Sequence, residues 1–460
     1  MSQHKVLFEQ PTDISSTVAS KWLAANQMRL DASFYIQEAF KARQIVARFP
    51  NQRMDQVTTV TYPYRFKRIY SDRTNGLPFL SATEALFFRP SSTRYLSKTK
   101  VPEIEQTIVK KGSLLLTRSG TVGRVVYVHD RLSRFAITDD LLRIVPLGNV
   151  KIGYVYAFLA SWMGQSLLTK DQYGSAVKHL EPEHVNRISI PVLSDKIQEE
   201  THKQILQAYG LREKANSLLD AADELMHTAL KLPQFIPSEV YSYSIRASEL
   251  DFRFDATYHT PEVRAIVTKL RASGPVVSLG PNVKKVFLPN RFKRVYVSKA
   301  QGVPFLSGRN IVEIKPYDIK YISSKVTKHL DELLIKKDWI LVTRSGTIGR
   351  VTLVPRHWEE WAATEHLLRV IPDETKLKGG YLAAFLMNPL GYRQVVGKTF
   401  GGVVHEISED NLRSVFVPLP RPDIQSKISE PTQEAFQLKE EANRIEHGAI
   451  STLENELVAS

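Results

Sequence analysis

The chain has 460 residues, of which 43% are hydrophobic and none is cysteine, so it can bury sizeable cores but cannot form disulfides, thiolate metal sites or a cysteine nucleophile. Its formal charge of +14 is compatible with simple solubility and equally with a polyanionic partner. No apolar run approaches the roughly 20 residues of a membrane span, and the opening stretch MSQHKVLFEQPTD lacks the apolar segment of a signal peptide. We therefore expect a cytoplasmic protein of roughly two to four domains, without membrane association.

The first part of the chain predicts an α+β globule. Residues 1–26 match no later segment and form an N-terminal extension, whereas residues 27–194 alternate runs rich in Val, Ile, Tyr and Phe with Gly, Pro, Asn and Ser. We expect strands at TTVTYPYRFKRIY, SLLLTRSG, GRVVYV and LLRIVP, then a helix at YVYAFLASWMGQSLL and one more strand at ISIPV. A globule of about 170 residues lies in the usual range for one domain.

A long helix is predicted for residues 195–232, and a second for residues 421–460. Between them, residues 233–420 hold a linker and a second α+β globule. In both helices apolar residues recur at three- and four-residue steps between charged flanks, which predicts a coiled-coil seam. The seam residues are Ile197, Ile205, Ala208, Ala215, Leu218, Ala222, Leu225 and Ala229 in the first helix, and Ile424, Ile428, Ala442, Ile445, Ala449, Leu453 and Leu457 in the second.

The second globule repeats the first at a nearly constant offset. RFKRIY at Arg65 returns as RFKRVY at Arg291, 226 residues later (291 − 65). The phrases LLTRSGTVGRV, GLPFLS and TDDLLRIVP return at the same offset as LVTRSGTIGRV, GVPFLS and TEHLLRVIP. After one inserted residue, YGSAVKHL at Tyr173 matches FGGVVHEI at Phe400. Chance periodicity does not hold register over such a length, so the chain contains two copies of one fold.

Connectivity predicts how the copies are joined. The first helix leads from one globule to the other, and the second must return, so we expect an antiparallel pair with a pseudo-two-fold axis between the globules. A helix of about 36 residues is about 54 Å long at about 1.5 Å per residue. That length is an upper limit of roughly 16 base pairs between globules that contact DNA.

The repeated phrase TRSGT(V/I)GR is a tight glycine turn with two possible roles. Its glycines allow positive φ angles and close backbone approach, and its hydroxyls can bind phosphate or cap the turn. Its arginines can contact phosphates or bases, or pair with carboxylates within the fold. The candidate DNA-binding residues here are Arg118, Ser119, Thr121 and Arg124 in the first copy, and Arg344, Ser345, Thr347 and Arg350 in the second.

Two further segments contribute candidates. RFKR alternates basic and aromatic residues, which suits nucleic acid but also an edge strand with its aromatic residue in the core. If it is a strand, Arg65 and Lys67 share one face and Phe66 and Arg68 the other. The loops with flexible glycines add histidines that can contact DNA or simply face solvent. The candidates in these segments are Arg65, Lys67, Arg68, Lys178 and His179 in the first copy, and Arg291, Lys293, Arg294 and His405 in the second.

Motifs for catalysis are missing. There is no Asn-Pro-Pro-aromatic motif, no glycine-rich loop for S-adenosylmethionine and no Walker loop ending in Gly-Lys-Ser/Thr. PDETK at Pro372 has its acids adjacent, whereas a nuclease site takes them from separate strands. The twelve histidines form no cluster with metal-ligand spacing. We therefore expect no catalytic residue and no metal site in this chain.

Taken together, TRSGTVGRV and TRSGTIGRV after apolar strands, RFKRVYVSKAQGVPFLSGRNI from Arg291, and VFVPLPRPDIQSKI from Val415 resemble the specificity (S, HsdS-like) subunits of type I restriction–modification enzymes. The resemblance implies that each globule is a target-recognition domain for one half of a split DNA site. It also implies that the helices set the spacing and dock DNA methyltransferase (M) subunits, with a restriction/translocase (R) subunit joining them. The first copy departs from the family because it ends in IPVLSDKIQEE without the usual PLPP junction.

We therefore expect a non-enzymatic subunit that reads double-stranded DNA at a split, asymmetric site. S-adenosylmethionine, ATP and Mg would be bound by the partner subunits, and this chain would hold no cofactor. One alternative is a self-sufficient DNA methyltransferase or nuclease, which a cofactor-binding assay would reveal. Another is a helical adaptor whose globules bind protein, for which DNA binding would lack sequence and salt dependence.

Overall fold

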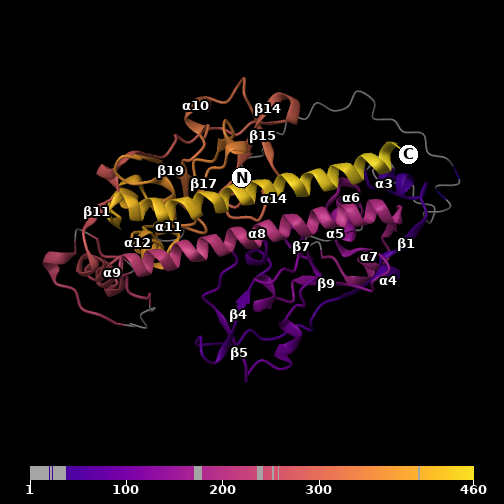
Figure 1. The fold of residues 1–460 in the computed structure, drawn as a ribbon, viewed down its shortest axis with the longest axis horizontal. Helices are drawn as coiled ribbons and strands as arrows, with labels where there is room; N and C mark the ends of the chain where they lie inside the picture. Colours follow the sequence, from indigo (N-terminus) through magenta and orange to yellow (C-terminus); the bar gives the residue numbers. More distant parts are fainter. Residues whose placement is uncertain are drawn as a thin grey trace. The chain divides into compact units, whose positions relative to one another are not determined.

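The computed structural model describes Ser20, Leu23 and residues 38–169, 179–235, 242–250, 253–256, 258–401 and 405–459. The described chain forms two compact units (Figure 1). We call residues 38–213 with 441–459 the N-terminal unit and residues 214–440 the C-terminal unit. Apart from two residues, the predicted extension 1–26 lies outside the described part of the chain.

The N-terminal unit contains two four-stranded sheets and one two-stranded ladder. One sheet has the strand order β2-β9-β6-β7, the other has β3-β5-β4-β8, and β1 pairs with β10. The apolar run LLLT makes β6 a fully buried centre of the first sheet. The strands are β1 Asn51–Arg53, β2 Thr58–Thr61, β3 Tyr70–Ser71, β4 Gly76–Leu80, β5 Tyr95–Ser97, β6 Leu114–Thr117, β7 Val125–Tyr127, β8 Ala136–Ile137, β9 Leu141–Pro146 and β10 Ser189–Pro191.

The C-terminal unit repeats this topology strand for strand. Its sheets have the orders β12-β19-β16-β17 and β13-β15-β14-β18, and β11 pairs with β20. The register is also repeated, because Leu114 faces Ile144 in one unit and Ile340 faces Val370 in the other. The strands are β11 Val276–Ser278, β12 Val283–Phe287, β13 Tyr296–Val297, β14 Gly302–Leu306, β15 Lys320–Ser323, β16 Ile340–Thr343, β17 Val351–Leu353, β18 Ala362–Ala363, β19 Leu367–Pro372 and β20 Phe416–Pro418.

Short helices cover the sheets in both units. In the N-terminal unit they are α3 Glu38–Val46, α4 Met54–Val57, α5 Ile152–Ala160, α6 Trp162–Thr169 and α7 Pro182–Asn186. In the C-terminal unit they are α9 Pro261–Ser273, α10 Leu330–Leu333, α11 Gly379–Met387, α12 Pro389–Val396 and α13 Glu409–Arg413. Helices α5 and α11 are almost entirely buried, as expected from their apolar sequences.

Two sequence predictions are wrong in detail. TTVTYPYRFKRIY is not one strand, because β2 ends at Thr61 and regular structure resumes only at Tyr70. Pro63, which has no backbone N–H to donate, stands at the start of this gap. The predicted single helix after each sheet is a pair, α5–α6 and α11–α12. A Cβ on Gly164 in α6 would lie 2.1 Å from the carbonyl oxygen of Phe158, so only glycine lets the second helix turn back so closely on the first.

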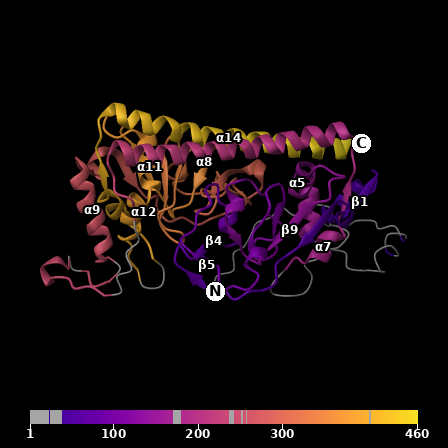
Figure 2. The ribbon, with the colours of Figure 1, turned by 60° about the horizontal axis from the view of Figure 1, so that its bottom comes forward.

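The long helices are α8, Asp195–Ala229, and α14, Pro422–Ala459 (Figure 2). The N-terminal unit contains the first half of α8 with the second half of α14, and the C-terminal unit contains the other two halves. A first half paired with a second half is the arrangement of antiparallel helices, as the connectivity of the chain predicted. Among the described residues, no helix combines the length and apolar character that a membrane crossing requires.

The seam between the long helices differs in part from the predicted one. Ala208, Ala215 and Ala222 are fully buried as expected, but Leu219 and Met226 replace Leu218 and Leu225 as the buried residues between them. The predicted seam was therefore right at Ala215 and Ala222 and one residue out of phase at Leu218 and Leu225. A buried ion pair between Arg212 and Glu446 also lies in the seam, in the N-terminal unit.

Candidate nucleic-acid interface

In both units the phrase TRSGT(V/I)GR forms the hairpin between two sheet strands, β6–β7 and β16–β17. The Thr117 hydroxyl accepts the backbone N–H of Arg124 at 2.8 Å, and the Thr117 carbonyl accepts that of Gly123 at 2.9 Å. The C-terminal unit repeats both bonds with Thr343. The φ angles are 72° and 90° at Gly120 and Gly123, and 73° and 78° at their twins, so the hairpin requires glycine. The duplicated phrase thus encodes a turn.

The first arginine of the phrase binds within the protein. Arg118 is only 5% exposed, forms an ion pair with Glu181, and donates to the Leu180 carbonyl at 3.2 Å. Its guanidinium also lies 4.8 Å from the centre of the Tyr62 ring. Arg344 makes the matching ion pair with Glu406. Both arginines therefore tie the hairpin to the segment before α7 or α13, which is the structural role that the sequence left open.

The other residues of the phrase lie nearer the surface. Ser119 and Thr121 are half-buried, and Thr347 is exposed. Arg124 and Arg350 are half-buried, and the Arg350 guanidinium lies 5.3 Å from the Tyr392 ring centre. The polar side chains of this phrase that are accessible to a ligand therefore lie at the hairpin tip.

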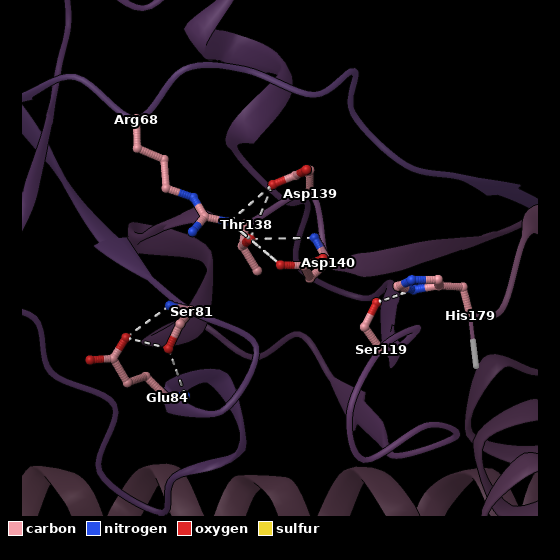
Figure 3. Close-up of polar contacts among 8 residues, drawn as sticks. All are labelled: Arg68, Ser81, Glu84, Ser119, Thr138, Asp139, Asp140 and His179. Atoms are coloured by element: carbon pink, nitrogen blue, oxygen red, sulfur yellow. Dashed lines mark hydrogen bonds and ion pairs between the residues drawn. The ribbon is translucent and has the colours of Figure 1, made fainter. Parts of the chain in front are cut away.

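The three repeated phrases meet at the turn between β8 and β9 in the N-terminal unit (Figure 3). Arg68 donates to the Thr138 hydroxyl at 3.1 Å and lies 3.4 Å from carboxylate oxygens of both Asp139 and Asp140. The backbone N–H of Arg118 donates to the Asp140 carbonyl at 3.3 Å. RFKR, TRSG and TDD are therefore parts of one cluster, although they are far apart in the sequence.

The C-terminal unit builds the same cluster between β18 and β19. Arg294 binds Glu365 at 2.6 Å and the Thr364 hydroxyl at 3.3 Å, and the Arg344 N–H donates to the His366 carbonyl at 2.9 Å. Burial alone raises the pKa of Glu365, but its backbone N–H and the Arg294 guanidinium hold that pKa below its ordinary value. Arg294 and Arg68 thus neutralise buried or half-buried carboxylates.

In each unit, the serine that follows the GLPFL or GVPFL strand binds a polar side chain three residues later. The partner side chain differs between the units. Ser81 binds Glu84 through its N–H at 2.8 Å and its hydroxyl at 2.6 Å. The matching Ser307 binds Asn310 at 3.0 and 2.7 Å. Shared backbone geometry is therefore combined with side chains that differ between the copies.

The hairpin serine binds a histidine in each unit, again from different places. Ser119 Oγ lies 2.7 Å from His179 Nδ1, and Ser345 Oγ lies 3.1 Å from His366 Nδ1. His405 is exposed and aligns with Lys178, which lies outside the described residues, whereas His179 aligns with Glu406. Sequence reasoning missed His366, although its position is the only one at which TDDLLRIVP and TEHLLRVIP differ in chemical type.

The RFKR segments display cations even though they are not strands. Arg65 and Lys67 are exposed on either side of Phe66, which is buried and contacts the Phe79 ring edge to face. Arg68 is turned into the acidic cluster, and its guanidinium lies 5.7 Å from the centre of the Phe79 ring that Phe66 contacts. In the C-terminal unit the matching Arg291 and Lys293 are exposed as well.

More exposed cations follow β5 and β15, which the sequence analysis did not single out. The N–H of Ser97 donates to the Ile69 carbonyl at 2.9 Å, and that of Lys98 to the Asn75 carbonyl at 3.1 Å, so the end of β5 lies against the segments around β3. Both units therefore carry cations at this sheet end. They are Arg73, Lys98 and Lys100 in one unit, and Lys299, Lys325 and Lys328 in the other.

The nuclease-like PDETK sequence has a structural role. Asp373 accepts the N–H and hydroxyl of Thr375, and Glu374 accepts the Gly379 N–H at the start of α11. Lys376 donates to the carbonyl of Pro281 at 3.0 Å. Across the described part of the chain, no cluster of three or more His, Asp or Glu side chains is arranged to hold a metal ion.

Comparison with known proteins finds a family model that matches part of the chain. Residues 298–453 match the family model "Type I restriction modification DNA specificity domain". No match was found among curated proteins.

Two solved structures are similar over most of their length. The S subunit of a type I restriction–modification system from M. genitalium is 11% identical, with a TM-score of 0.32 and coverage of 89% of this chain and 94% of that one. The HsdS subunit from Thermoanaerobacter tengcongensis is 13% identical, with a TM-score of 0.29 and coverage of 89% and 95%. The specificity-domain model thus matches residues 298–453 directly, and the internal repeat makes much of the first half of the chain similar to the matched segment.

Proposed function

We propose that this chain is the sequence-specific DNA-recognition subunit of a type I restriction–modification system, in which each unit reads one half of a split site. The observation that carries this proposal is the duplicated cluster, in which one backbone frame holds Asp140 in one unit and His366 in the other. Two copies with different side chains at one position suit two different half-sites, so the whole target is asymmetric.

The distribution of charge supports a division of work between phosphates and bases. Arg65, Lys67, Arg291 and Lys293 are exposed at matching positions in the two units, as expected for contacts that do not depend on sequence. Neutralising phosphates releases counterions and makes affinity fall with salt. Base-edge contacts then supply the specificity, and they belong at positions where the units differ.

The rest of the function lies on partner subunits. In this proposal M subunits dock on α8 and α14 and methylate adenine with S-adenosylmethionine, and an R subunit with ATP and Mg restricts unmodified DNA. The chain itself is non-catalytic and works in the cytoplasm. The lengths of α8 and α14 support their use as the spacer between half-sites.

Methylome sequencing of a host with and without the gene tests the function. We expect one split, asymmetric methylated motif that disappears with the gene and returns with a plasmid copy. Replacing residues 250–420 by the matching segment of a relative should then change one half of that motif only. An unchanged methylome, together with binding of the purified chain to DNA that is insensitive to sequence and salt, would show that the chain is an adaptor instead.

A further inference from the structure

The serine-bound histidines are the feature that the duplicated turn does not explain. Ser119 and Ser345 occupy the same hairpin position, set by the same positive-φ glycine after each of them. Their histidines come from different segments, since His179 lies just before α7 and His366 lies between β18 and β19. The Thr117 and Thr343 bonds of the same hairpin, by contrast, are repeated with the same partner in both units.

Both imidazoles can reach a ligand. His179 is exposed, and the His366 side chain is 39% exposed. In each case the serine hydroxyl contacts Nδ1, which fixes the ring plane and leaves Nε2 for another partner. In the N-terminal unit the two side chains meet at the edge of the Arg68 cluster (Figure 3).

A carboxylate lies near each ring and is itself paired with an arginine, Glu365 with Arg294 and Glu181 with Arg118. Nε2 of His366 lies 3.7 Å from a carboxylate oxygen of Glu365, and the half-buried acid Glu181 follows His179 by two residues. A polar, charge-balanced surrounding of this kind suits base edges, which carry donors as well as acceptors. Matching exposed cations elsewhere in each unit are available for phosphates.

We propose that His179 and His366 are specificity-determining residues that read a base edge in the major groove through Nε2, each for the half-site of its own unit. The hairpin serines act as positioning residues that orient the rings through Nδ1. This inference rests on the proposed function, because it names atoms that recognise the DNA. It also explains how one hairpin sequence can serve two half-sites, because the turn is shared but the histidine comes from a different segment in each unit.

The test is selection of bound sequences from a randomised duplex pool by the full-length chain and by single variants. Asparagine places its amide where Nδ1 lies and lacks an atom at Nε2, whereas glutamine places its amide near Nε2. His179→Asn should therefore lower discrimination roughly ten-fold at one or two base pairs of one half-site, and His179→Gln should keep most of it. His366→Asn and His366→Gln should behave in the same way at the other half-site. His405→Ala is the matched control, because His405 is exposed and belongs to the loop that the sequence aligned with that of His179.

The outcomes separate the two levels of the hypothesis. If the wild-type chain enriches no sequence, the proposed function fails. If it enriches a split site and His179→Asn and His366→Asn enrich the same site with the same discrimination, the proposed function stands and the histidines have only a structural role. A weaker affinity that is equal for all sequences, with a flatter salt dependence, would place them on phosphates and also overturn this inference.

Discussion

At the turn that follows β8, the N-terminal unit carries Asp139 and Asp140 around Arg68, whereas the turn after β18 in the C-terminal unit carries Glu365 and His366 around Arg294. The two turns have the same backbone hydrogen bonds to the TRSG hairpin, yet their ionic content differs by one carboxylate. The conserved part of the repeat therefore builds a frame, and the divergent part sits on it. This separation allows the side chains at one position to differ between the units while the backbone stays the same.

The long helices show the same contrast between the units. Arg212 and Glu446 form a buried ion pair in the N-terminal unit, and the matching positions in the C-terminal unit hold Lys439 and Leu219 (439 − 212 = 446 − 219 = 227). Glu446 also accepts from the Tyr156 hydroxyl at 2.6 Å, so the pair joins both long helices to α5. The C-terminal unit has an apolar residue at one of the two matching positions.

The largest effect expected is from removing one member of this pair. Glu446→Leu leaves the Arg212 charge buried and unpaired, and should lower the free energy of unfolding by about 3–5 kcal/mol. Urea titration followed by circular dichroism measures the loss, and hydrogen exchange should locate it in the N-terminal unit. The double variant with Arg212→Met and Glu446→Leu should recover most of the stability. If both variants lose equally, packing rather than charge holds this part of the seam.

The helix pairs α5–α6 and α11–α12 provide a test in which the two units should behave alike. A Cβ at Gly164 or Gly391 would lie 2.1 Å from the carbonyl oxygen of Phe158 or Phe385, so either Gly→Ala change should cost roughly 1–3 kcal/mol. Gly448 in α14 has no atom within 4 Å of its virtual Cβ, and Gly448→Ala should instead stabilise by up to about 1 kcal/mol. Thermal unfolding of the three variants compares them. Different losses at Gly164 and Gly391 would show that the units are not energetically equivalent.

Two adjacent basic residues of the second RFKR segment should have different roles, Lys293 in DNA binding and Arg294 in stability. Lys293→Ala should lower the salt slope of DNA binding by about one unit and change stability by less than about 0.5 kcal/mol. Arg294→Ala should leave the salt slope unchanged and cost about 1–3 kcal/mol, because Glu365, only 8% exposed, loses its partner. Binding isotherms at several salt concentrations and urea titrations measure the two quantities. A flatter slope for Arg294→Ala would return that residue to the DNA-binding candidates predicted from the sequence.

The smallest expected effect is a dependence of stability on pH. It follows from a residue that differs between the units where α5 and α11 approach the long helices. His202 Nδ1 accepts the Gly153 N–H at 3.1 Å, whereas the matching residue in α14 is Ser429. Burial lowers the pKa of His202, so the unfolded chain binds more protons than the folded one just below the unfolded pKa of about 6.5. Stability of the N-terminal unit should therefore fall as pH drops from about 7 towards 5. His202→Ser should remove that dependence, and an unaltered pH profile of unfolding would exclude His202 as its source.

The frame of the fold could be predicted from sequence because it is written twice. Constant offsets identified the two units, and paired glycines identified the hairpins, whose positive φ angles the structure confirms. The partners of the arginines could not be predicted, since Glu181 and Glu406 occupy different positions relative to the repeat and reach Arg118 and Arg344 only in three dimensions. His366 was missed because an acid-to-histidine difference within a repeated phrase does not by itself indicate a function. The contact between His366 and the hairpin serine is visible only in the structure.

The N-terminal unit includes the second half of α14, so it cannot be completed until the end of that helix has been synthesised. Arg212, Tyr156 and the N–H of Trp162 all bind residues of α14 that come more than 200 positions later. At synthesis rates of about 5–20 residues per second, those partners follow by roughly 10–60 s, so the globule that leaves the ribosome first is the one completed last. During that interval the second globule can fold on its own segment while the first waits with part of its helix seam uncovered. Chaperone binding during translation should therefore concentrate on the earlier half of the chain, and truncation within the last two dozen residues should damage that half more than its neighbour.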